Sequence, residues 1–91
     1  MDYLKKREIR QALSKKKIVW TGDLNDDCIA RWAGLILRAE AMDEGSWWWS
    51  VSDELTDVEL EVDSSNNYDE PVTAGQEARN LAEAAARTYV A

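Results

Sequence analysis

Apolar and acidic residues alternate without a break over positions 57–63, which read Asp-Val-Glu-Leu-Glu-Val-Asp. This period-two pattern predicts a half-buried β-strand. Residues 47–52 also alternate after their first position, and residues 53–56 separate the two runs as a turn. We therefore predict an antiparallel hairpin. One face would carry Trp47, Trp49, Val51, Val58, Leu60 and Val62, and the other Trp48, Ser50, Ser52, Glu59, Glu61 and Asp63.

A second pattern, with helical spacing, covers residues 28–42. Apolar residues recur there every three or four positions, which predicts an amphipathic helix. Asp23 or Asn25 would cap this helix and Gly45 would end it. Gly34 costs about 1 kcal/mol inside a helix, so we expect another backbone to approach closely there. The apolar stripe comprises Cys28, Ile29, Trp32, Leu35, Ile36, Ala39 and Met42.

Two further helices are expected near the ends of the chain. Residues 2–14 are rich in strong helix formers, and Asp2 can act as the N-cap. The apolar side chains of this helix share a face only in its second half, so we expect it to dock there. Near the other end, Thr73 and Gln76 match a capping box. The face of that last helix would carry Ala74, Ala78, Leu81, Ala82, Ala85 and Tyr89.

Two short segments have no single interpretation. Residues 18–20, Ile-Val-Trp, form either a short strand or a loop that Trp20 anchors. Residues 66–68 are a candidate third strand within an otherwise polar stretch.

These elements predict an α+β fold, a small two-layer sandwich. Two or three helices would pack on one face of a short antiparallel sheet of two to three strands. No linker or repeat divides residues 1–91, so we expect a single domain. A basic N-terminal helix within residues 1–17 would dock loosely on an acidic α-β-β-α body over residues 23–91. The other face of the sheet would be acidic and open to solvent.

Charge is distributed unevenly along the 91 residues, whose formal net charge is −7. Residues 1–17 hold seven basic side chains and two acidic ones, and no basic residue lies between Arg38 and Arg79. An acidic body favours a partner with a basic surface and opposes phosphate binding, so nucleic acid is disfavoured. The basic side chains that offer a second interface are Lys5, Lys6, Arg7, Arg10, Lys15, Lys16 and Lys17.

Residues that commonly carry catalysis are scarce. The chain has no histidine, and its single cysteine, Cys28, lies on an apolar stripe, where we expect a structural role. Residues 63–69 offer oxygen ligands at alternate positions, loosely like a calcium loop. Tyr68 and Ala74 stand where such a loop has its glycine and its bidentate glutamate. We therefore expect no enzymatic activity, no cofactor and no metal.

A single cysteine fits a reducing compartment. The N-terminal residues lack the apolar stretch of a signal peptide, and no apolar run approaches the length of a bilayer span. We expect a cytoplasmic protein that is not inserted in a membrane.

The strongest candidate for a binding site is Trp48. Alternation places this aromatic side chain on the polar strand face, among acids, as in an interface hot spot with a polar rim. We predict that the chain binds a basic protein through this acidic, Trp-centred sheet face. The alternative is that the basic N-terminal helix or a second copy of the chain covers Trp48. The predicted site residues are Trp48, Ser50, Asp53, Glu54, Asp57, Glu59, Glu61 and Asp63.

In size and charge the chain is similar to phage anti-defence proteins, including anti-CRISPR proteins, and to nuclease-immunity proteins. The likeness implies an inhibitor of a nucleic-acid-handling protein, with carboxylates in place of phosphates as a nucleic-acid mimic. One alternative is a self-associating accessory protein, a homodimer in which the acidic sheet of one copy meets the basic helix of another. A second is nucleic-acid binding through residues 5–17. The element order of residues 45–90 resembles a double-stranded RNA-binding domain, but residues 73–77 lack the lysines of such domains.

Overall fold

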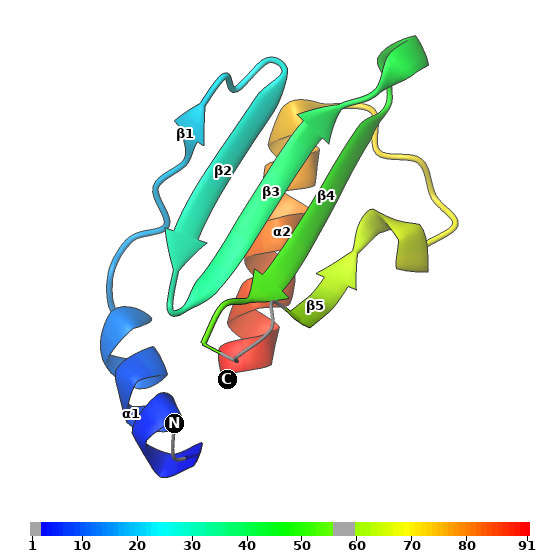
Figure 1. The fold of residues 1–91 in the computed structure, drawn as a ribbon. Coiled ribbons are helices and arrows are strands. Elements are labelled where there is room, and N and C mark those ends of the chain that lie inside the picture. The colour runs from blue at the N-terminus through cyan, green and yellow to red at the C-terminus, as the bar shows by residue number, and fades with distance from the viewer. Residues whose placement is uncertain (1–2, 56–59) are drawn as a thin grey trace.

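Five antiparallel strands lie side by side in chain order in the computed structural model, with one long helix behind them (Figure 1). The structure describes residues 3–55 and 60–91. The helices are α1 (Tyr3–Leu13) and α2 (Gly75–Val90), and the short 3-10 helices are η1 (Asp43–Gly45) and η2 (Ser65–Asn67). The strands are β1 (Thr21–Gly22), β2 (Asp27–Trp32), β3 (Leu35–Ala41), β4 (Trp47–Asp53) and β5 (Leu60–Ser64). The α+β class is therefore confirmed, with more strands than expected.

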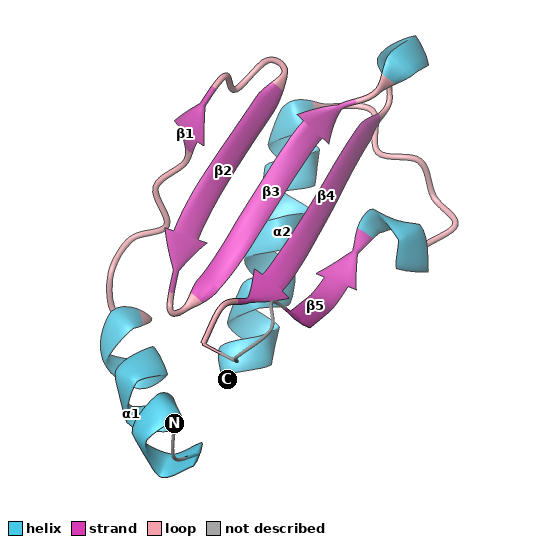
Figure 2. Cartoon of the chain, viewed as in Figure 1, coloured by secondary structure: helices cyan, strands magenta, loops and turns pink. Residues whose placement is uncertain are grey.

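The largest error of the sequence prediction lies in residues 23–42, where a β2–β3 hairpin replaces the expected helix (Figure 2). Ala33 and Gly34 form the turn, both at positive φ (55° and 74°), as a type I′ turn requires. In each strand the side chains at alternate positions point to the α2 side and are buried there, so one face of the hairpin contributes to the core. The helical stripe was a coincidence of spacing. The residues buried on the α2 side are Cys28, Ala30 and Trp32 on β2, and Leu35, Leu37 and Ala39 on β3; Ile36 of β3 is buried as well, on the opposite face.

Helix α2 covers the same face of the sheet as these residues. Ala78, Ala82 and Ala86 are fully buried, and their small side chains let the helix lie close against β3 and β4. The expected helix face was therefore rotated, since Leu81 and Tyr89 are 38% and 44% exposed. The predicted capping box does not form, because the N-cap is Ala74, without a side-chain cap bond.

The predicted hairpin of residues 47–63 is confirmed for its described part, β4 and β5, while residues 57–59 lie outside the described residues. A bulge lies between the pairs Ser52–Glu61 and Val51–Asp63, and it adds Val62 to the β5 side. Asp63 therefore points to the α2 side with Val51, which corrects its expected place on the open face. The candidate strand at residues 66–68 is wrong, because η2 and an extended residue occupy it.

Helix α1 lies beyond the end of the sheet rather than on its face (Figure 1). The expectation of two or three helices packed on one face of the sheet is therefore wrong in number; among the described residues, only α2 covers a face. Residues 18–20 form a loop, and Trp20 anchors it by donating its indole N–H to Glu83 at 3.2 Å. The indole of Trp32 donates to the Lys16 carbonyl at 2.8 Å, so the segment after α1 is fixed to the sheet.

Candidate functional site

The predicted partner surface, the sheet face opposite α2, carries both signs of charge. The side chain of Trp48 is half-buried there, with Glu40 as its cross-strand neighbour and Asp27 beside Glu40. Arg38 is on this face because it is two residues from Glu40 on β3, and alternate residues of a strand share a face. Arg31 is on it because it pairs with Ile36, which is two residues from Arg38. The expectation of an acidic face is therefore wrong, since two guanidinium groups stand among its carboxylates.

The structure separates most of the other predicted site residues from Trp48. Ser50 is buried, and Asp63 lies on the α2 side. Glu54 is exposed, and its carboxylate is 3.8 Å from the Arg31 guanidinium. Glu61 is exposed at the far end of the open face. Asp57 and Glu59 lie outside the described residues.

Asp53 is a structural residue rather than a contact for a partner. Its side chain is 4% exposed and accepts hydrogen bonds from Arg10 Nη2 (2.8 Å), the Tyr89 hydroxyl (2.9 Å) and the Leu55 amide (2.9 Å). Burial by itself would raise the pKa of this carboxyl. The hydrogen bonds from Arg10, Leu55 and Tyr89, with the charge of Arg10, outweigh it and hold the pKa below its ordinary value. Asp53 thus ties α1, β4 and α2 together.

The predicted basic interface is only partly available. Arg10 is engaged with Asp53, and its second nitrogen donates to the Ala33 carbonyl at 3.1 Å. Lys5 and Lys6 lie in α1, but their side chains fall outside the described part of the chain. The exposed basic side chains are Arg7, Lys15, Lys16 and Lys17.

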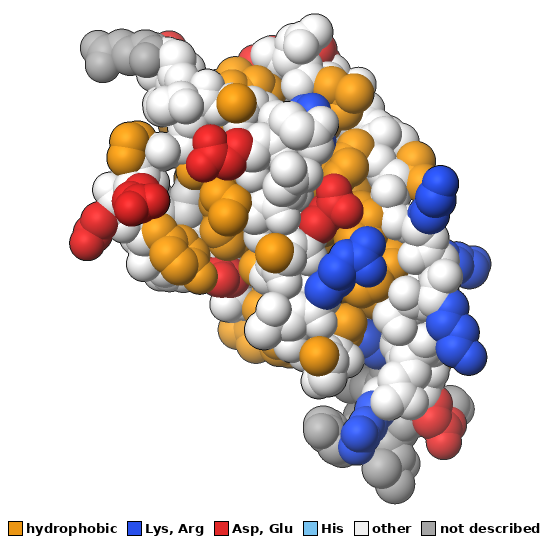
Figure 3. Space-filling model, turned by 180° about the vertical axis from the view of Figure 1, so that it is seen from behind, with side chains coloured by type: hydrophobic (Ala, Val, Ile, Leu, Met, Phe, Trp, Pro, Cys, Tyr) orange, Lys and Arg blue, Asp and Glu red, His pale blue; other side chains and the backbone are white. Residues whose placement is uncertain are grey.

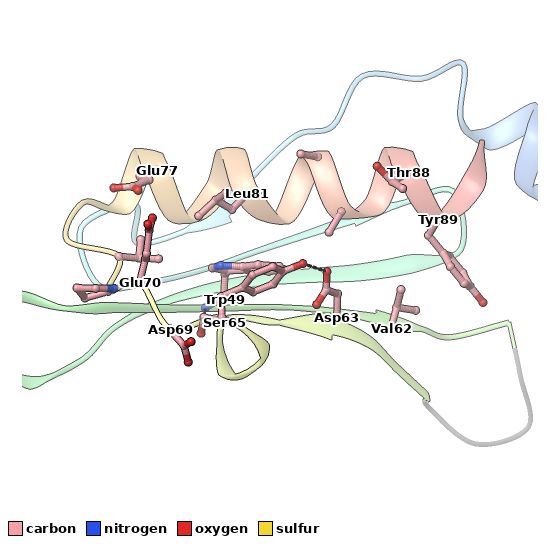
Figure 4. A pocket seen from close by; sticks show the side chains of 15 residues that line it. Trp49, Val62, Asp63, Ser65, Asp69, Glu70, Glu77, Leu81, Thr88 and Tyr89 are labelled. Carbon is pink, nitrogen blue, oxygen red and sulfur yellow. Dashed lines mark hydrogen bonds between the residues drawn. The ribbon is translucent and has the colours of Figure 1, made fainter.

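A groove that the sequence analysis missed runs between α2 and the β5 edge of the sheet (Figure 4). Its volume is about 580 Å³, within the usual range for ligand pockets. Helix α2 packs mainly over β3 and β4. The space above β5 is therefore bordered by the loop of residues 68–72 as well as by the edge of α2. The apolar lining residues are Trp49, Val62, Tyr68, Pro71, Val72, Leu81, Ala84, Ala85 and Tyr89.

Carboxylates stand along this groove, and none of the described residues that line it is Lys or Arg. Asp69, Glu70 and Glu77 are exposed, whereas Asp63 is half-buried in the wall of the groove. Figure 3 shows the α2 side of the molecule, with acids and apolar patches together on the left, toward β5. Most basic side chains gather on the right, along α1, so the charge asymmetry of the sequence becomes an asymmetry in space.

Asp63 organises the wall of the groove. One carboxylate oxygen accepts from the Tyr68 hydroxyl at 2.9 Å, and the other from Asn67 at 3.0 Å and the Ser64 amide at 2.9 Å. The hydrogen bond to Asp63, together with its negative charge, raises the pKa of Tyr68, so its hydroxyl stays a donor. The Tyr68 ring is thereby held 5.9 Å from that of Trp49, tilted by 32°.

Sequence reasoning missed the groove for two reasons. Leu81 and Tyr89 were assigned to the core, although they reach past it into the groove, and residues 64–70 were interpreted as a solvated turn. The available signal was an acidic pair, Asp69 and Glu70, directly before an apolar Pro-Val step that leads into a helix.

No protein-family model matches this chain, and no curated protein or solved structure matches it. Among the described residues, no group of three or more cysteine or acidic side chains is placed to hold a metal ion. The helices of the described part are too short or too polar to cross a membrane.

Proposed function

We propose that this chain is a non-enzymatic protein-binding module whose groove takes a basic, amphipathic segment of a partner protein. The observation that carries the proposal is that apolar side chains and exposed carboxylates line the same groove. The described lining contains no basic side chain. Apolar side chains of the segment would enter the groove beside Leu81 and Tyr89. Its Lys or Arg side chains would lie against Asp69, Glu70 and Glu77.

The physical roles of the two components differ. Burial of apolar side chains contributes affinity at roughly 25 cal/mol per Å² of area removed from water. The carboxylates attract a basic segment during approach and reject an acidic one, which gives specificity and association rate. The same chemistry fits the nucleic-acid-binding surface of a nuclease or effector complex. An inhibitory role against such a protein, of the kind that phage anti-defence and immunity proteins have, is the finer form of this proposal.

The direct test uses two synthetic peptides of equal length, one alternating Lys and Leu and the other alternating Glu and Leu. Amide chemical shifts of the labelled protein are followed by NMR during each titration. We expect the Lys-Leu peptide to shift amides around Val62, Asp69 and Leu81, with weaker binding at higher salt because screening shortens the reach of surface charge. The Glu-Leu peptide should leave these amides unmoved.

A matched pair of variants locates the site. The double substitution Asp69→Lys/Glu70→Lys reverses two exposed acids of the groove. The control Asp26→Lys/Asp43→Lys makes the same change in charge at two exposed positions outside the groove lining. We expect the first variant to lose peptide binding and the second to retain most of it. Equal losses would mean that net charge alone attracts the peptide, and would refute a groove-specific site.

A further inference from the structure

The two edges of the sheet are covered unequally (Figure 1). On one side β1 pairs with β2, and the Lys16 carbonyl accepts the indole N–H of Trp32, so residues 16–22 lie along that edge. On the other side β5 is the outermost strand of the described residues. Every second residue of an antiparallel strand turns its N–H and C=O away from its partner. One of the neighbouring residues Leu60 and Glu61 therefore directs these groups outward, to the side where a further strand would pair.

Strand β5 also exposes apolar area next to the groove. Leu60 is 57% exposed and pairs with Asp53, which accepts the Tyr89 hydroxyl on the α2 side. Because directly paired residues share a face, Leu60 stands on the α2 side as well. Val62, at the bulge, lines the groove itself. Together with the exposed groove residues, these side chains form a continuous apolar area of the kind that marks an interaction site. The exposed apolar side chains of the groove are Tyr68, Leu81 and Tyr89.

The side of β5 that faces away from α2 is acidic. Glu61 is exposed there and pairs with Ser52. Arg31 lies in the same cross-strand row but three strands away, roughly 14 Å at the usual strand spacing, and its guanidinium is 3.8 Å from Glu54. Cross-strand pairs of opposite charge or of two apolar residues stabilise a sheet. On an added strand, Lys or Arg is therefore favoured beside Glu61, and an apolar residue beside Leu60.

From this uncovered strand and its two unlike sides we infer that the groove's partner binds as an extended segment, which adds a sixth strand beside β5. Apolar side chains of the segment turn to Leu60 and the groove, and alternate Lys or Arg side chains turn to Glu61. Figure 4 shows Asp69 and Glu70 at the end of the groove away from Tyr89, where they attract flanking basic residues. The inference rests on the proposed function, because it states how the segment bound at that groove is held.

An extended segment fits β5 better than a helix or a second copy of the chain. A helix satisfies its own backbone groups, so it leaves the outward groups of β5 unpaired, whereas an added strand pairs them. A second copy brings its own Glu61 and Asp63 to a strand that is already acidic, and like charges destabilise a strand pair. The bulge at Val62 and the Ser64 amide, which donates to the Asp63 carboxylate, limit regular pairing to a few residues. The segment is therefore short.

Two peptides of equal composition test the inference. One is the alternating Lys-Leu peptide, and the other is reordered so that its Leu residues have helical spacing. Fluorescence anisotropy of labelled peptides measures both affinities, and we expect the alternating peptide to bind at least about tenfold more tightly. Its binding should also slow hydrogen exchange at the outward amide of the pair Leu60–Glu61, while the amides of β1, at the opposite edge, exchange as before.

N-methylation of the alternating peptide blocks backbone hydrogen bonds and leaves every side chain in place. In a strand, the residues on one face turn their N–H groups to the same edge. One derivative carries methyl groups on its Leu nitrogens and the other on its Lys nitrogens, so only one of them blocks the edge that meets β5. We expect the two derivatives to differ in affinity at least about tenfold. Which derivative loses binding reports whether the segment runs parallel or antiparallel to β5.

A matched pair of protein variants tests the charged side of the added strand. Glu61→Lys should weaken binding of the alternating peptide by about fivefold, because it replaces an attractive cross-strand pair with a repulsive one. The control Asp43→Lys makes the same change in charge at an exposed residue of η1, outside the groove lining. Circular dichroism establishes that both variants are folded. Equal losses in the two variants would overturn the placement of basic side chains beside Glu61.

The outcomes separate this inference from the proposed function. Strand addition is overturned if the two methylated derivatives bind equally, if the reordered peptide binds as tightly as the alternating one, or if exchange at Leu60–Glu61 is unchanged on binding. The proposed function survives each of these results as long as Asp69→Lys/Glu70→Lys still abolishes binding. If the alternating peptide does not bind at all, the proposed function and the inference fail together.

Discussion

The buried contact between Arg10 and Asp53 predicts how α1 contributes to stability. The two side chains are 13% and 4% exposed, and the guanidinium also donates to the Ala33 carbonyl and lies 5.3 Å from the Tyr89 ring centre. Loss of one partner of a buried ion pair costs about 3–5 kcal/mol. Arg10→Ala leaves Asp53 two donors, Leu55 and Tyr89. We therefore expect a loss of about 2–3 kcal/mol in the free energy of unfolding, below that range.

The pH dependence gives this prediction a second readout. The pKa of Asp53 is lower in the folded protein than its ordinary value of 3.8. Its ionisation therefore stabilises the fold at pH values above 3.8, and this contribution is lost as pH falls through the lowered folded pKa. Arg10→Ala removes the strongest donor and moves the pKa back up. The difference in stability between wild type and Arg10→Ala should be largest near neutral pH and shrink in acid.

Urea unfolding, followed by circular dichroism at neutral pH and below pH 4, measures both effects. The control is Arg7→Ala, which removes an exposed arginine of the same helix. A change in an exposed side chain is usually worth less than about 0.5 kcal/mol. If Arg10→Ala lost no more stability than Arg7→Ala, or if its deficit grew in acid, the assignment of Asp53 as the anchor of α1 would be wrong.

Two matched comparisons test other parts of the fold. Gly34 and Gly45 both have positive φ, but a Cβ on Gly34 would lie 2.5 Å from the Leu55 side chain, whereas one on Gly45 meets nothing within 4 Å. Gly45→Ala should lower the free energy of unfolding by about 1 kcal/mol, because alanine is strained at positive φ. Gly34→Ala should lower it clearly more, because its Cβ also meets Leu55. Urea unfolding measures both losses, and equal losses would contradict the contact with Leu55. Trp49 is 2% exposed in the core, so Trp49→Ala should cost about 3–5 kcal/mol, while the half-buried Trp48 should cost much less when replaced by alanine. Thermal unfolding compares the two tryptophan variants, and a larger loss for Trp48→Ala than for Trp49→Ala would contradict the assigned strand faces.

Local sequence determined the elements whose pattern admits one interpretation. Alternation over residues 47–63 suits only a strand pair, and β4 and β5 form it. The Ala-rich segment after residue 73 forms α2, because strong helix formers fill most of residues 76–87 and no β-branched residue interrupts them. Net charge follows from the composition, and its uneven distribution follows from the order of the residues. An acidic and a basic side of the molecule were therefore predictable in outline.

Tertiary structure decided what local pattern left ambiguous. Cys28, Trp32, Leu35 and Ala39 satisfy both a helical stripe and alternate strand positions, and the turn lacks the Asn-Gly or Asp-Gly signal of a tight hairpin. The strand interpretation prevails because β3 pairs with both β2 and β4, which satisfies its backbone and buries its apolar face under α2. Such pairing depends on residues distant in sequence, and no local window contains them.

The same reason explains the site. The bulge at Val62 moves Asp63 to the α2 side, and the groove combines side chains from β4, β5, η2, the loop of residues 68–72 and α2. The sequence by itself determined that acidic side chains outnumber basic ones outside residues 1–17. Which carboxylates stand together, and over which apolar floor, follows only from how α2 packs across the sheet and leaves β5 uncovered.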